Sequence, residues 1–317
     1  MNVMKTLSDD NINFIGIYGI GGVAKTTLVK EFGKQAKSDK LFDEVVMDVV
    51  SQNPDIKKIQ DKIGGILAIG IPSYRDHKGC KIIITTQREQ VCNSMEMERL
   101  RTKILHLSVL SEKDSWDLFK KNVGDVVDSN KLNILANEVC KECGGLPIAL
   151  VTVGSAMKGK DDPNLWNDAA RELRKSMPPN IEGVDQQVCK SLRLSYDYLQ
   201  DEKAKACFLL YSLFPEDHNI LIEDLVRYGM GLRVFKKVDT MLEANGRAKS
   251  VTDNLIAPCL LLASDNKQDC IKMHDVVCDV AIDIGSKQYL VRAGCNLKDW
   301  PNMDSLDLYT GISLMRN

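Results

Sequence analysis

The chain has 317 residues, of which 44% are apolar and 27% are charged, and its formal net charge at pH 7 is −2. This composition is typical of a folded protein with two or three domains. It excludes a polybasic nucleic-acid surface, because Lys and Arg are interspersed with acids. No apolar run approaches the ~20 residues that span a bilayer, and no apolar signal core follows Met1–Lys5. We therefore expect a cytoplasmic protein that binds neither membrane nor nucleic acid.

A glycine-rich segment near the N-terminus predicts a phosphate-binding loop. Phe14–Tyr18 has the pattern of a buried strand, Leu28–Phe32 that of a helix, and Lys25-Thr26 ends the glycine-rich turn between them. In such a loop, backbone N–H groups and the positive end of the helix dipole surround phosphate oxygens. We expect Lys25 to reach the β- and γ-phosphates and the Thr26 hydroxyl to bind Mg²⁺. Ala24 departs from the pattern, which has glycine before the lysine.

Strands and helices then alternate as far as residue 107. Further apolar strands are expected at Glu44–Val50, Cys80–Thr86 and Ile104–Leu107, and a helix over Ile56–Leu67. Near-continuous apolar strands separated by helices predict a parallel sheet covered on both faces.

Helical spacing replaces this alternation after residue 110. Ser111 and Asp114 resemble a capping box, and further helices are predicted over Lys131–Cys143 and Pro147–Met157. This region is predicted to be a small helical domain.

Ten cysteines occur, and only Cys140 and Cys143 are spaced as a C-x-x-C pair. No second pair or histidine cluster completes a zinc site. Both cysteines share a predicted helical face with apolar residues, which favours reduced core thiols over metal or redox chemistry.

The region from about residue 181 to 286 is predicted to be helical with one late hairpin. Asp201 is expected to cap a helix that runs through Cys207–Leu210. Cys259–Ala263 and Cys270–Met273 flank a turn at Asp265–Gln268, which is a hairpin signal. Helices followed by a hairpin suggest a winged-helix unit, whereas residues 287–317 show no clear periodicity.

Five blocks along the chain together resemble one family, and they occur in the order Gly19–Thr27, Lys81–Arg88, Gly144–Leu150, Cys207–Pro215 and Met273–Asp275. Over about residues 3–290 the chain resembles the NB-ARC core of plant disease-resistance proteins of the coiled-coil, leucine-rich-repeat class, which are STAND P-loop NTPases. The resemblance implies an α/β P-loop nucleotide-binding domain with one strand missing from its parallel sheet, followed by a helical domain and a winged-helix domain. The corresponding boundaries are 1–107, 108–180 and 181–290, with 291–317 as a linker towards an absent leucine-rich-repeat region.

The resemblance also implies an ADP or ATP site with weakly bound Mg²⁺. Arg88 matches a sensor arginine near the terminal phosphate, and Pro147 matches a proline that packs near adenine. His274 matches a histidine that touches the β-phosphate of ADP and holds a closed, inactive state, which exchange to ATP would open. The implied phosphate-binding residues are Gly19, Gly21, Gly22, Val23, Ala24, Lys25, Thr26 and Thr27. Taken alone, Arg88 is better explained as a solvated strand-end residue, Pro147 as a helix start and His274 as a helix-cap or core histidine.

The largest departure from the family is a missing strand. Family members place an apolar strand ending in two aspartates before the sensor strand, and these carboxylates hold the Mg²⁺ waters and help orient the attacking water. Here Gly64–Pro72 runs directly into Cys80, and Asp48 is a poor substitute because it lies inside a predicted strand. We therefore expect no efficient ATPase activity and an unpaired sheet edge. The family's upstream segment, coiled coil and repeat array are also expected to be absent, as in a truncated gene product.

These features suggest three candidate functions. The first is an ADP- or ATP-binding switch core of an immune receptor, with other immune-receptor or defence proteins as partners. The second is a degenerate adaptor that no longer binds nucleotide and acts through protein contacts. A DNA-binding regulator is disfavoured, because phosphate contacts need clustered Lys or Arg.

Overall fold

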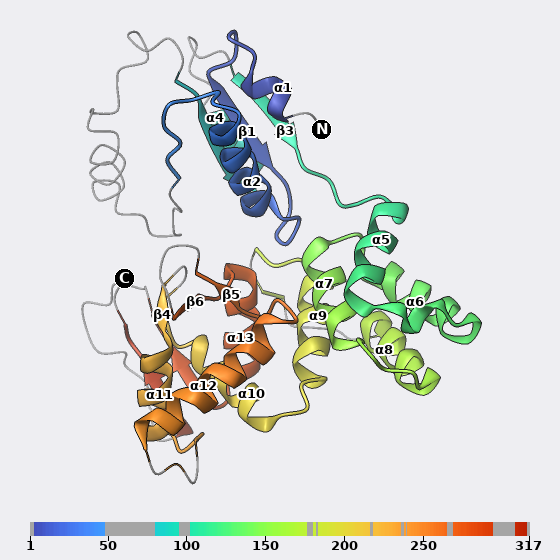
Figure 1. Cartoon of the computed structure of the whole chain (residues 1–317), viewed down its shortest axis with the longest axis vertical. Coiled ribbons are helices and arrows are strands. Elements are labelled where there is room, and N and C mark those ends of the chain that lie inside the picture. Colours follow the sequence, from blue (N-terminus) through green and yellow to red (C-terminus); the bar gives the residue numbers. More distant parts are fainter. Residues whose placement is uncertain are drawn as a thin grey trace. The chain divides into compact units, whose positions relative to one another are not determined.

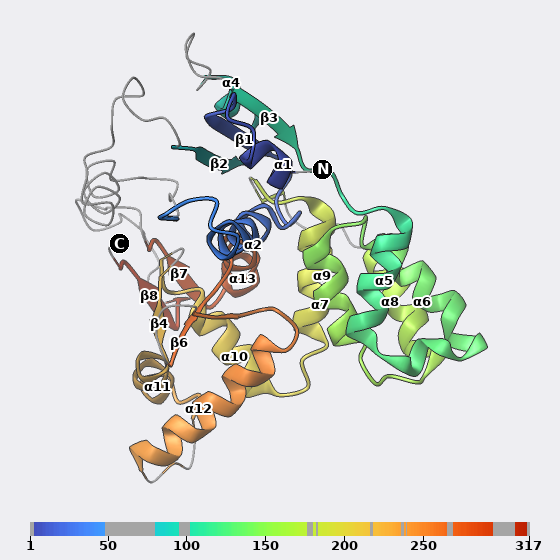
Figure 2. The ribbon, with the colours of Figure 1, turned by 45° about the horizontal axis from the view of Figure 1, so that its top comes forward.

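A computed structural model of the chain describes residues 3–47, 80–94, 102–175, 180–181, 183–215, 218–235, 238, 240–264, 269–293 and 308–315. These residues divide into two compact units, Met1–Ser108 and Val109–Asn317. Figure 1 labels most of the helices and strands of both units, and Figure 2 also labels β2, β7 and β8.

A three-stranded parallel sheet forms the centre of the first unit (Figure 1). Its strands are β1 (Phe14–Tyr18), β2 (Ile82–Thr86) and β3 (Thr102–His106), in the order β2-β1-β3. Tyr18 is in register with both Thr86 and His106, so the three strands end at the same edge. The prediction of a parallel sheet is confirmed.

Helices cover the two faces of β1. Ile15 and Ile17 are fully buried and pack with Val3 and Leu7 in a core that α2 also joins through Val29 and Phe32. Gly16 faces the opposite side, because successive residues of a strand alternate, and there its Cα lies against Cys92. The helices involved are α1 (Val3–Leu7), α2 (Lys25–Ser38) and α4 (Glu89–Ser94).

The strand expected at Glu44–Val50 is wrong for its described part, because Glu44–Met47 has no strand structure. A strand needs a neighbour to satisfy its backbone N–H and C=O groups, and within the described residues β2 pairs with β1 alone. Ile82 on β2 is 45% exposed, which is unusual for a β-branched residue of a parallel sheet. Residues 48–50 and the helix expected over Ile56–Leu67 lie outside the described residues.

The second unit begins with a bundle of short helices around two buried aromatic rings. Phe119 and Trp166 are fully buried and meet edge to face, with ring centroids 6.4 Å apart. The helix predicted over Pro147–Met157 is present, and its residues Ala149, Leu150 and Val153 are fully buried. The bundle consists of α5 (Glu112–Val123), η1 (Asp125–Asp128), α6 (Asn130–Glu142), α7 (Pro147–Ala156) and α8 (Pro163–Lys175).

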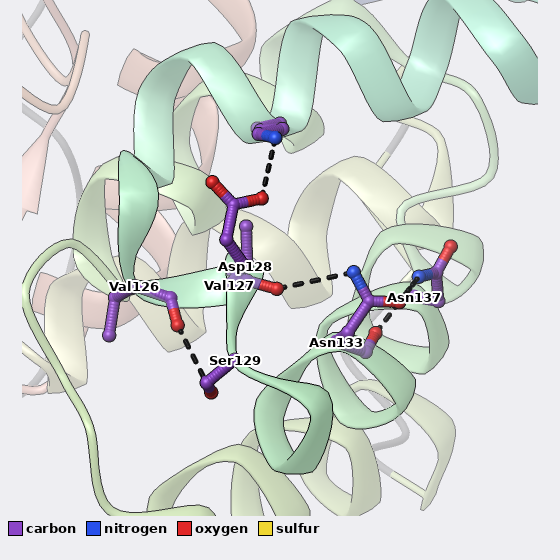
Figure 3. A network of polar contacts seen from close by, with 7 residues as sticks. Val126, Val127, Asp128, Ser129, Asn133 and Asn137 are labelled. Atoms are coloured by element: carbon purple, nitrogen blue, oxygen red, sulfur yellow. Dashed lines mark hydrogen bonds and ion pairs between the residues drawn. The ribbon is translucent and has the colours of Figure 1, made fainter.

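Side-chain hydrogen bonds connect η1 with the first turns of α6 (Figure 3). Asn133 Nδ2 donates to the Val127 carbonyl at 3.2 Å, and Asn137 Nδ2 donates to the Asn133 carbonyl at 2.9 Å. Ser129 caps α6 by accepting from the Leu132 N–H. The Asn133 and Ser129 bonds satisfy backbone groups where η1 ends and α6 begins, whereas the Asn137 bond lies within α6.

The rest of the second unit combines helices with two small sheets; Figure 2 labels its helices α9–α13 and the strands β4, β6, β7 and β8. Strands β4, β6 and β5 form an antiparallel sheet in that order, and the β5–β6 pairing confirms the predicted hairpin; its turn, 265–268, lies outside the described residues. The parallel pair β7–β8 was not predicted. The elements are α9 (Gln186–Asp197), α10 (Glu202–Tyr211), β4 (Ile220–Leu221), α11 (Ile222–Gly231), α12 (Met241–Ile256), β5 (Leu262–Ala263), β6 (Cys270–Lys272), α13 (Asp275–Gly285), β7 (Tyr289–Val291) and β8 (Gly311–Ser313).

The Ser111 cap predicted at the start of α5 is observed and gives a stability test. Ser111 Oγ accepts from the Asp114 N–H at 3.2 Å and donates to the Asp114 carboxylate at 2.6 Å. We expect Ser111→Ala to lower the free energy of unfolding by about 1 kcal/mol, because the cap is lost. Urea denaturation followed by circular dichroism would measure this, with the exposed Lys113→Ala as the control. An unchanged midpoint for Ser111→Ala would contradict the cap's contribution.

Candidate functional site

The glycine-rich loop begins where the carboxyl ends of three strands meet. The Gly19 N–H donates to the Thr86 carbonyl at 3.3 Å, and the Leu107 N–H donates to the Tyr18 carbonyl at 2.7 Å. A Cβ on Gly19 would lie 2.5 Å from the Leu107 carbonyl oxygen, so only glycine fits there. The loop therefore leaves the sheet at the carboxyl edge of its central strand, where α/β proteins bind ligands.

Ala24 stands where the loop pattern has glycine, and its backbone adopts a conformation that favours glycine. It is the N-cap residue of α2 and lies in the left-handed region, with φ 66° and ψ 31°. For a residue with a Cβ this costs roughly 1–2 kcal/mol. The loop keeps the shape of a phosphate-binding turn despite the missing glycine, at a cost in local strain.

Lys25 bends back over the loop that precedes it. Its ammonium donates to the Gly19 carbonyl at 2.7 Å and to the Ile20 carbonyl at 2.8 Å. The ammonium therefore lies above the backbone that would surround a phosphate, and it can exchange carbonyl oxygens for phosphate oxygens with little movement.

The exposed residues Thr26 and Thr27 form the first turn of α2. The first N–H groups of any α-helix lack intrahelical acceptors, and here the N-cap side chain provides none. These donors and the helix dipole suit an anion. The Thr26 hydroxyl is a suitable oxygen ligand for Mg²⁺, whose remaining positions water and phosphate oxygens would fill. No group of three or more His, Cys, Asp or Glu side chains suited to a metal occurs in the part of the chain that the structure describes.

Arg88 lies beside the loop, at the same edge of the sheet. It follows the end of β2 by two residues, and its N–H donates to Thr86 Oγ1 at 3.2 Å. Since the Thr86 carbonyl also accepts from Gly19, one residue anchors both the loop and the segment carrying Arg88. The Arg88 backbone thus lies at the edge of the sheet from which the loop leaves; its role near a phosphate stays a prediction.

The Gly144–Pro147 turn of the second unit depends on a glycine. Gly145 has φ +70°, and a Cβ there would lie 2.8 Å from the Leu110 carbonyl oxygen. The Gly145 carbonyl in turn accepts from the Leu110 N–H at 2.9 Å. This turn places Pro147 at the first position of α7, half-buried.

His274 is the N-cap of α13 and directly follows the hairpin strand β6. Its side chain is 33% exposed, and its Nδ1 lies against the Asp275 carboxylate. That carboxylate also accepts from the Val276 N–H at 2.7 Å. The helix α13 is tied to α9 by the ion pair between Asp283 and Arg193. Pro147 and His274 both belong to the second unit, so their contacts with a nucleotide stay predictions.

Helices that start at predicted nucleotide-binding residues lack a side-chain cap. Side chains of Ser111, Ser129, Asp185, Asp201 and Thr240 cap α5, α6, α9, α10 and α12. By contrast, α2, α7 and α13 have Ala24, Leu146 and His274 at the N-cap without a side-chain hydrogen bond. The helix α11, whose N-cap is Leu221, also lacks a side-chain hydrogen bond at its N-cap. The missing cap is therefore not unique to the helices of the predicted site.

The predicted core role of the C-x-x-C pair is confirmed. Cys140 is 5% exposed, Cys143 is fully buried, and both are free thiols. Burial raises the pKa of Cys140 to about 11 and that of Cys143 well above its ordinary value. Both thiols therefore stay protonated at neutral pH, which suits neither metal binding nor redox chemistry.

One contact at the carboxyl edge was missed in the sequence. The Tyr18 ring lies 4.9 Å from the ring of His106, and burial together with the nearby Glu89 side chain raises the pKa of Tyr18. The position of Tyr18 directly before Gly19 was the available signal.

Strand, glycine-rich turn, lysine and helix in this geometry define a P-loop nucleotide-binding domain. The family model described as NB-ARC domain matches the chain over residues 1–69 and 64–129. The chain therefore belongs to the NB-ARC proteins, and it is related over nearly its whole length to plant disease resistance proteins.

Three relatives from Arabidopsis thaliana illustrate this similarity. Disease resistance protein At4g27190 is 33% identical over 98% of this chain and 36% of its own length. Disease resistance protein RPS5 is 31% identical over 98% of this chain and 40% of its own length, and disease resistance protein RFL1 is 30% identical over 99% and 41%. The chain thus spans well under half the length of these relatives. In the described parts of both units, we find no helix long and apolar enough to cross a membrane.

The alignments also show that this chain is shorter within the matched region. The alignment with At4g27190 covers 360 positions, whereas the chain has 317 residues, so at least 43 positions have no counterpart here. The family model matches in two pieces that meet at residues 64–69, next to the place where the sequence analysis found a strand missing.

The strain at Ala24 can be measured by removing its Cβ. We expect Ala24→Gly to raise the free energy of unfolding by about 0.5–1 kcal/mol, because relief of the left-handed strain exceeds the added entropy of an unfolded glycine. Chemical denaturation would measure the change. The same substitution at Ala36, buried within α2, should instead destabilise the protein by about 1 kcal/mol or more. Destabilisation by Ala24→Gly would contradict the strain.

Cysteine labelling tests the burial of the C-x-x-C pair. Cys80 is exposed, whereas the raised pKa of Cys140, about 11, leaves very little thiolate at pH 8. We expect iodoacetamide at pH 8 to label Cys80 in the native protein and Cys140 and Cys143 only after denaturation, as read by mass spectrometry of peptides. Equal labelling rates of Cys80 and Cys140 in the native state would contradict this.

Proposed function

We propose that the chain is the nucleotide-binding switch core of a plant immune receptor, that it retains ADP, and that it hydrolyses ATP weakly or not at all. The observation that carries the proposal is the loop at the carboxyl edge of β1, with Lys25 folded over it and uncapped N–H donors behind it. Membership of the NB-ARC proteins supports the same function.

Two further residues connect the nucleotide with the second unit in this proposal. Pro147 packs near adenine, and His274 contacts the β-phosphate of ADP, so that the ADP-bound state is closed. The residues that carry His274 form a winged-helix domain over 181–290, which is supported by the helices α10–α12 and the antiparallel sheet β4-β6-β5. A helical domain over 108–180 separates it from the P-loop domain, 1–107.

Weak hydrolysis follows from the proposed loss of the acidic strand. The positions without counterpart in this chain and the divided family match support that loss. Without those carboxylates, Mg²⁺ is held by Thr26 and phosphate alone, and the attacking water lacks an orienting group. We accordingly propose that the chain acts by binding nucleotide and other defence proteins in the cytoplasm.

Purification with bound nucleotide tests the proposal. We expect the isolated protein to release ADP on denaturation, as detected by chromatography, and Lys25→Ala to carry none, because the loop then lacks its cation. Lys34→Ala is the matched control, since Lys34 lies on α2 in an exposed ion pair with Glu31. Well-folded, monodisperse wild-type protein that contains no nucleotide and binds no added ADP would overturn the proposal.

The second candidate is an adaptor that has lost nucleotide binding. The left-handed Ala24, whose methyl group lies in the loop, favours it. Ala24→Gly separates the two candidates: if ADP binds only after this substitution, the natural chain is a non-binder. If wild-type and Ala24→Gly both bind ADP, the adaptor is excluded.

A further inference from the structure

The helix α9 is fastened to the bundle of α5–α8 at both of its ends. At its start, Gln187 Nε2 donates to the Glu142 carbonyl at the end of α6. At its other end, the Tyr198 hydroxyl donates to the Leu165 carbonyl of α8 at 3.2 Å. Between these bonds Leu192 is fully buried, and α9 packs against α7 and α8. The helix α9 is thus part of the bundle.

The helix α13 belongs by its contacts to the helices that follow α9. Its last residue, Gly285, lies against Leu209 of α10, whose Cδ2 would be 3.5 Å from an added Cβ. Val280 is fully buried. At the other end of α13, the His274 carbonyl accepts from the Val277 N–H at 2.9 Å, so the backbone of His274 is part of the helix. A displacement of α13 therefore carries His274 with it.

An ion pair joins these two groups of helices where α9 and α13 lie side by side (Figure 1). It connects Arg193 of α9 with Asp283 of α13, and the two side chains are only 30% and 27% exposed. Solvent and salt therefore screen their attraction less than that of a surface pair. Asp283 also lies near the C-terminal end of α13, where the helix dipole disfavours a negative charge. Contact with Arg193 offsets this unfavourable position.

Arg193 has a second carboxylate within reach if α13 moves away. Asp197 is exposed and lies four residues further along α9, the spacing at which opposite charges pair on a helix. In the described part of the chain, Arg193 Nε is buried without a hydrogen-bond partner, which costs free energy. Separation of α13 from α9 would return this donor to water and leave the guanidinium beside Asp197. The ion pair is therefore suited to reversible opening.

We propose that the ion pair between Arg193 and Asp283 is a latch between α9 and α13 that slows the release of bound ADP. The proposal rests on the proposed function, in which His274 contacts the β-phosphate of ADP and the ADP-bound state is closed. Because His274 begins the helix that carries Asp283, the latch opposes movement of His274 away from the nucleotide. Arg193 acts through α13 and is thus a positioning residue.

The first test needs no nucleotide. Asp283→Asn keeps the shape of the side chain and removes its charge. We expect faster amide hydrogen exchange over residues 274–285 in this variant, measured by mass spectrometry of nucleotide-free protein, because α13 then separates from α9 more often. Arg193→Gln should have the same effect. The double variant should exchange no faster than either single variant, since the same interaction is removed in all three.

Two further variants control this experiment. Asp168→Asn removes an exposed ion pair with Arg171 that lies within α8 alone, and it should leave exchange over residues 274–285 unchanged. Arg193→Lys keeps the positive charge and should exchange more slowly than Arg193→Gln. Unchanged exchange in Asp283→Asn, or effects of the two single substitutions that add in the double variant, would overturn the latch.

The second test measures the release of a fluorescent ADP analogue by stopped flow. We expect Asp283→Asn and Arg193→Gln each to release it about fivefold faster than the wild type, the scale of one partly buried ion pair. The double variant should be no faster, and Asp168→Asn should release at the wild-type rate. Release at the wild-type rate from both single variants would overturn the effect on ADP. If the wild-type chain binds no ADP, the proposed function fails together with that effect, while the exchange experiment still decides whether the ion pair holds α13.

Discussion

The loop of the first unit depends on the position of Gly19 between two backbone carbonyls. Its N–H bonds the Thr86 carbonyl of β2, and its Cα approaches the Leu107 carbonyl after β3 so closely that no side chain fits. Both contacts exist because β1 is the central strand and ends in register with its neighbours. The loop's starting point is therefore set by strand pairing, and its ability to bind phosphate depends on the sheet remaining intact.

The packing of the first unit also explains how the loop keeps its shape although Ala24 replaces the expected glycine. Ala24 adopts a left-handed backbone that its Cβ disfavours. The loop is fixed at one end by Gly19 and at the other by α2, whose apolar residues Val29 and Phe32 pack against the core of the first unit. When both ends are fixed by packing, the backbone between them has few alternatives, and the strain remains in the native state. The altered residue therefore changes the energy of the loop more than its geometry.

Much of this organisation could be predicted from the sequence because local patterns determine it. The apolar runs predicted β2 and β3 to within two residues, Ser111 and Asp114 marked the start of α5, and the spacing of Cys140 and Cys143 indicated a buried face. The strand expected at Glu44–Val50 failed in its described part, because apolar character alone does not make a strand without a neighbour. The pair β7–β8 and the ring contact between Tyr18 and His106 escaped prediction, since each joins residues that are far apart in the chain and carry no periodic signal.

The contrast between capped and uncapped helices has a thermodynamic consequence. Where Ser, Thr or Asp caps a helix, the chain satisfies its own donors, and solvent composition affects that helix end little. At the starts of α2, α7 and α13 the N-cap side chain makes no hydrogen bond. An anion that binds at such a helix start binds only the folded state, and by mass action its free concentration then contributes to the stability of the protein. The melting temperature of this chain is therefore expected to depend on the anions in solution. It should differ between buffers that contain phosphate or sulfate and buffers that contain neither.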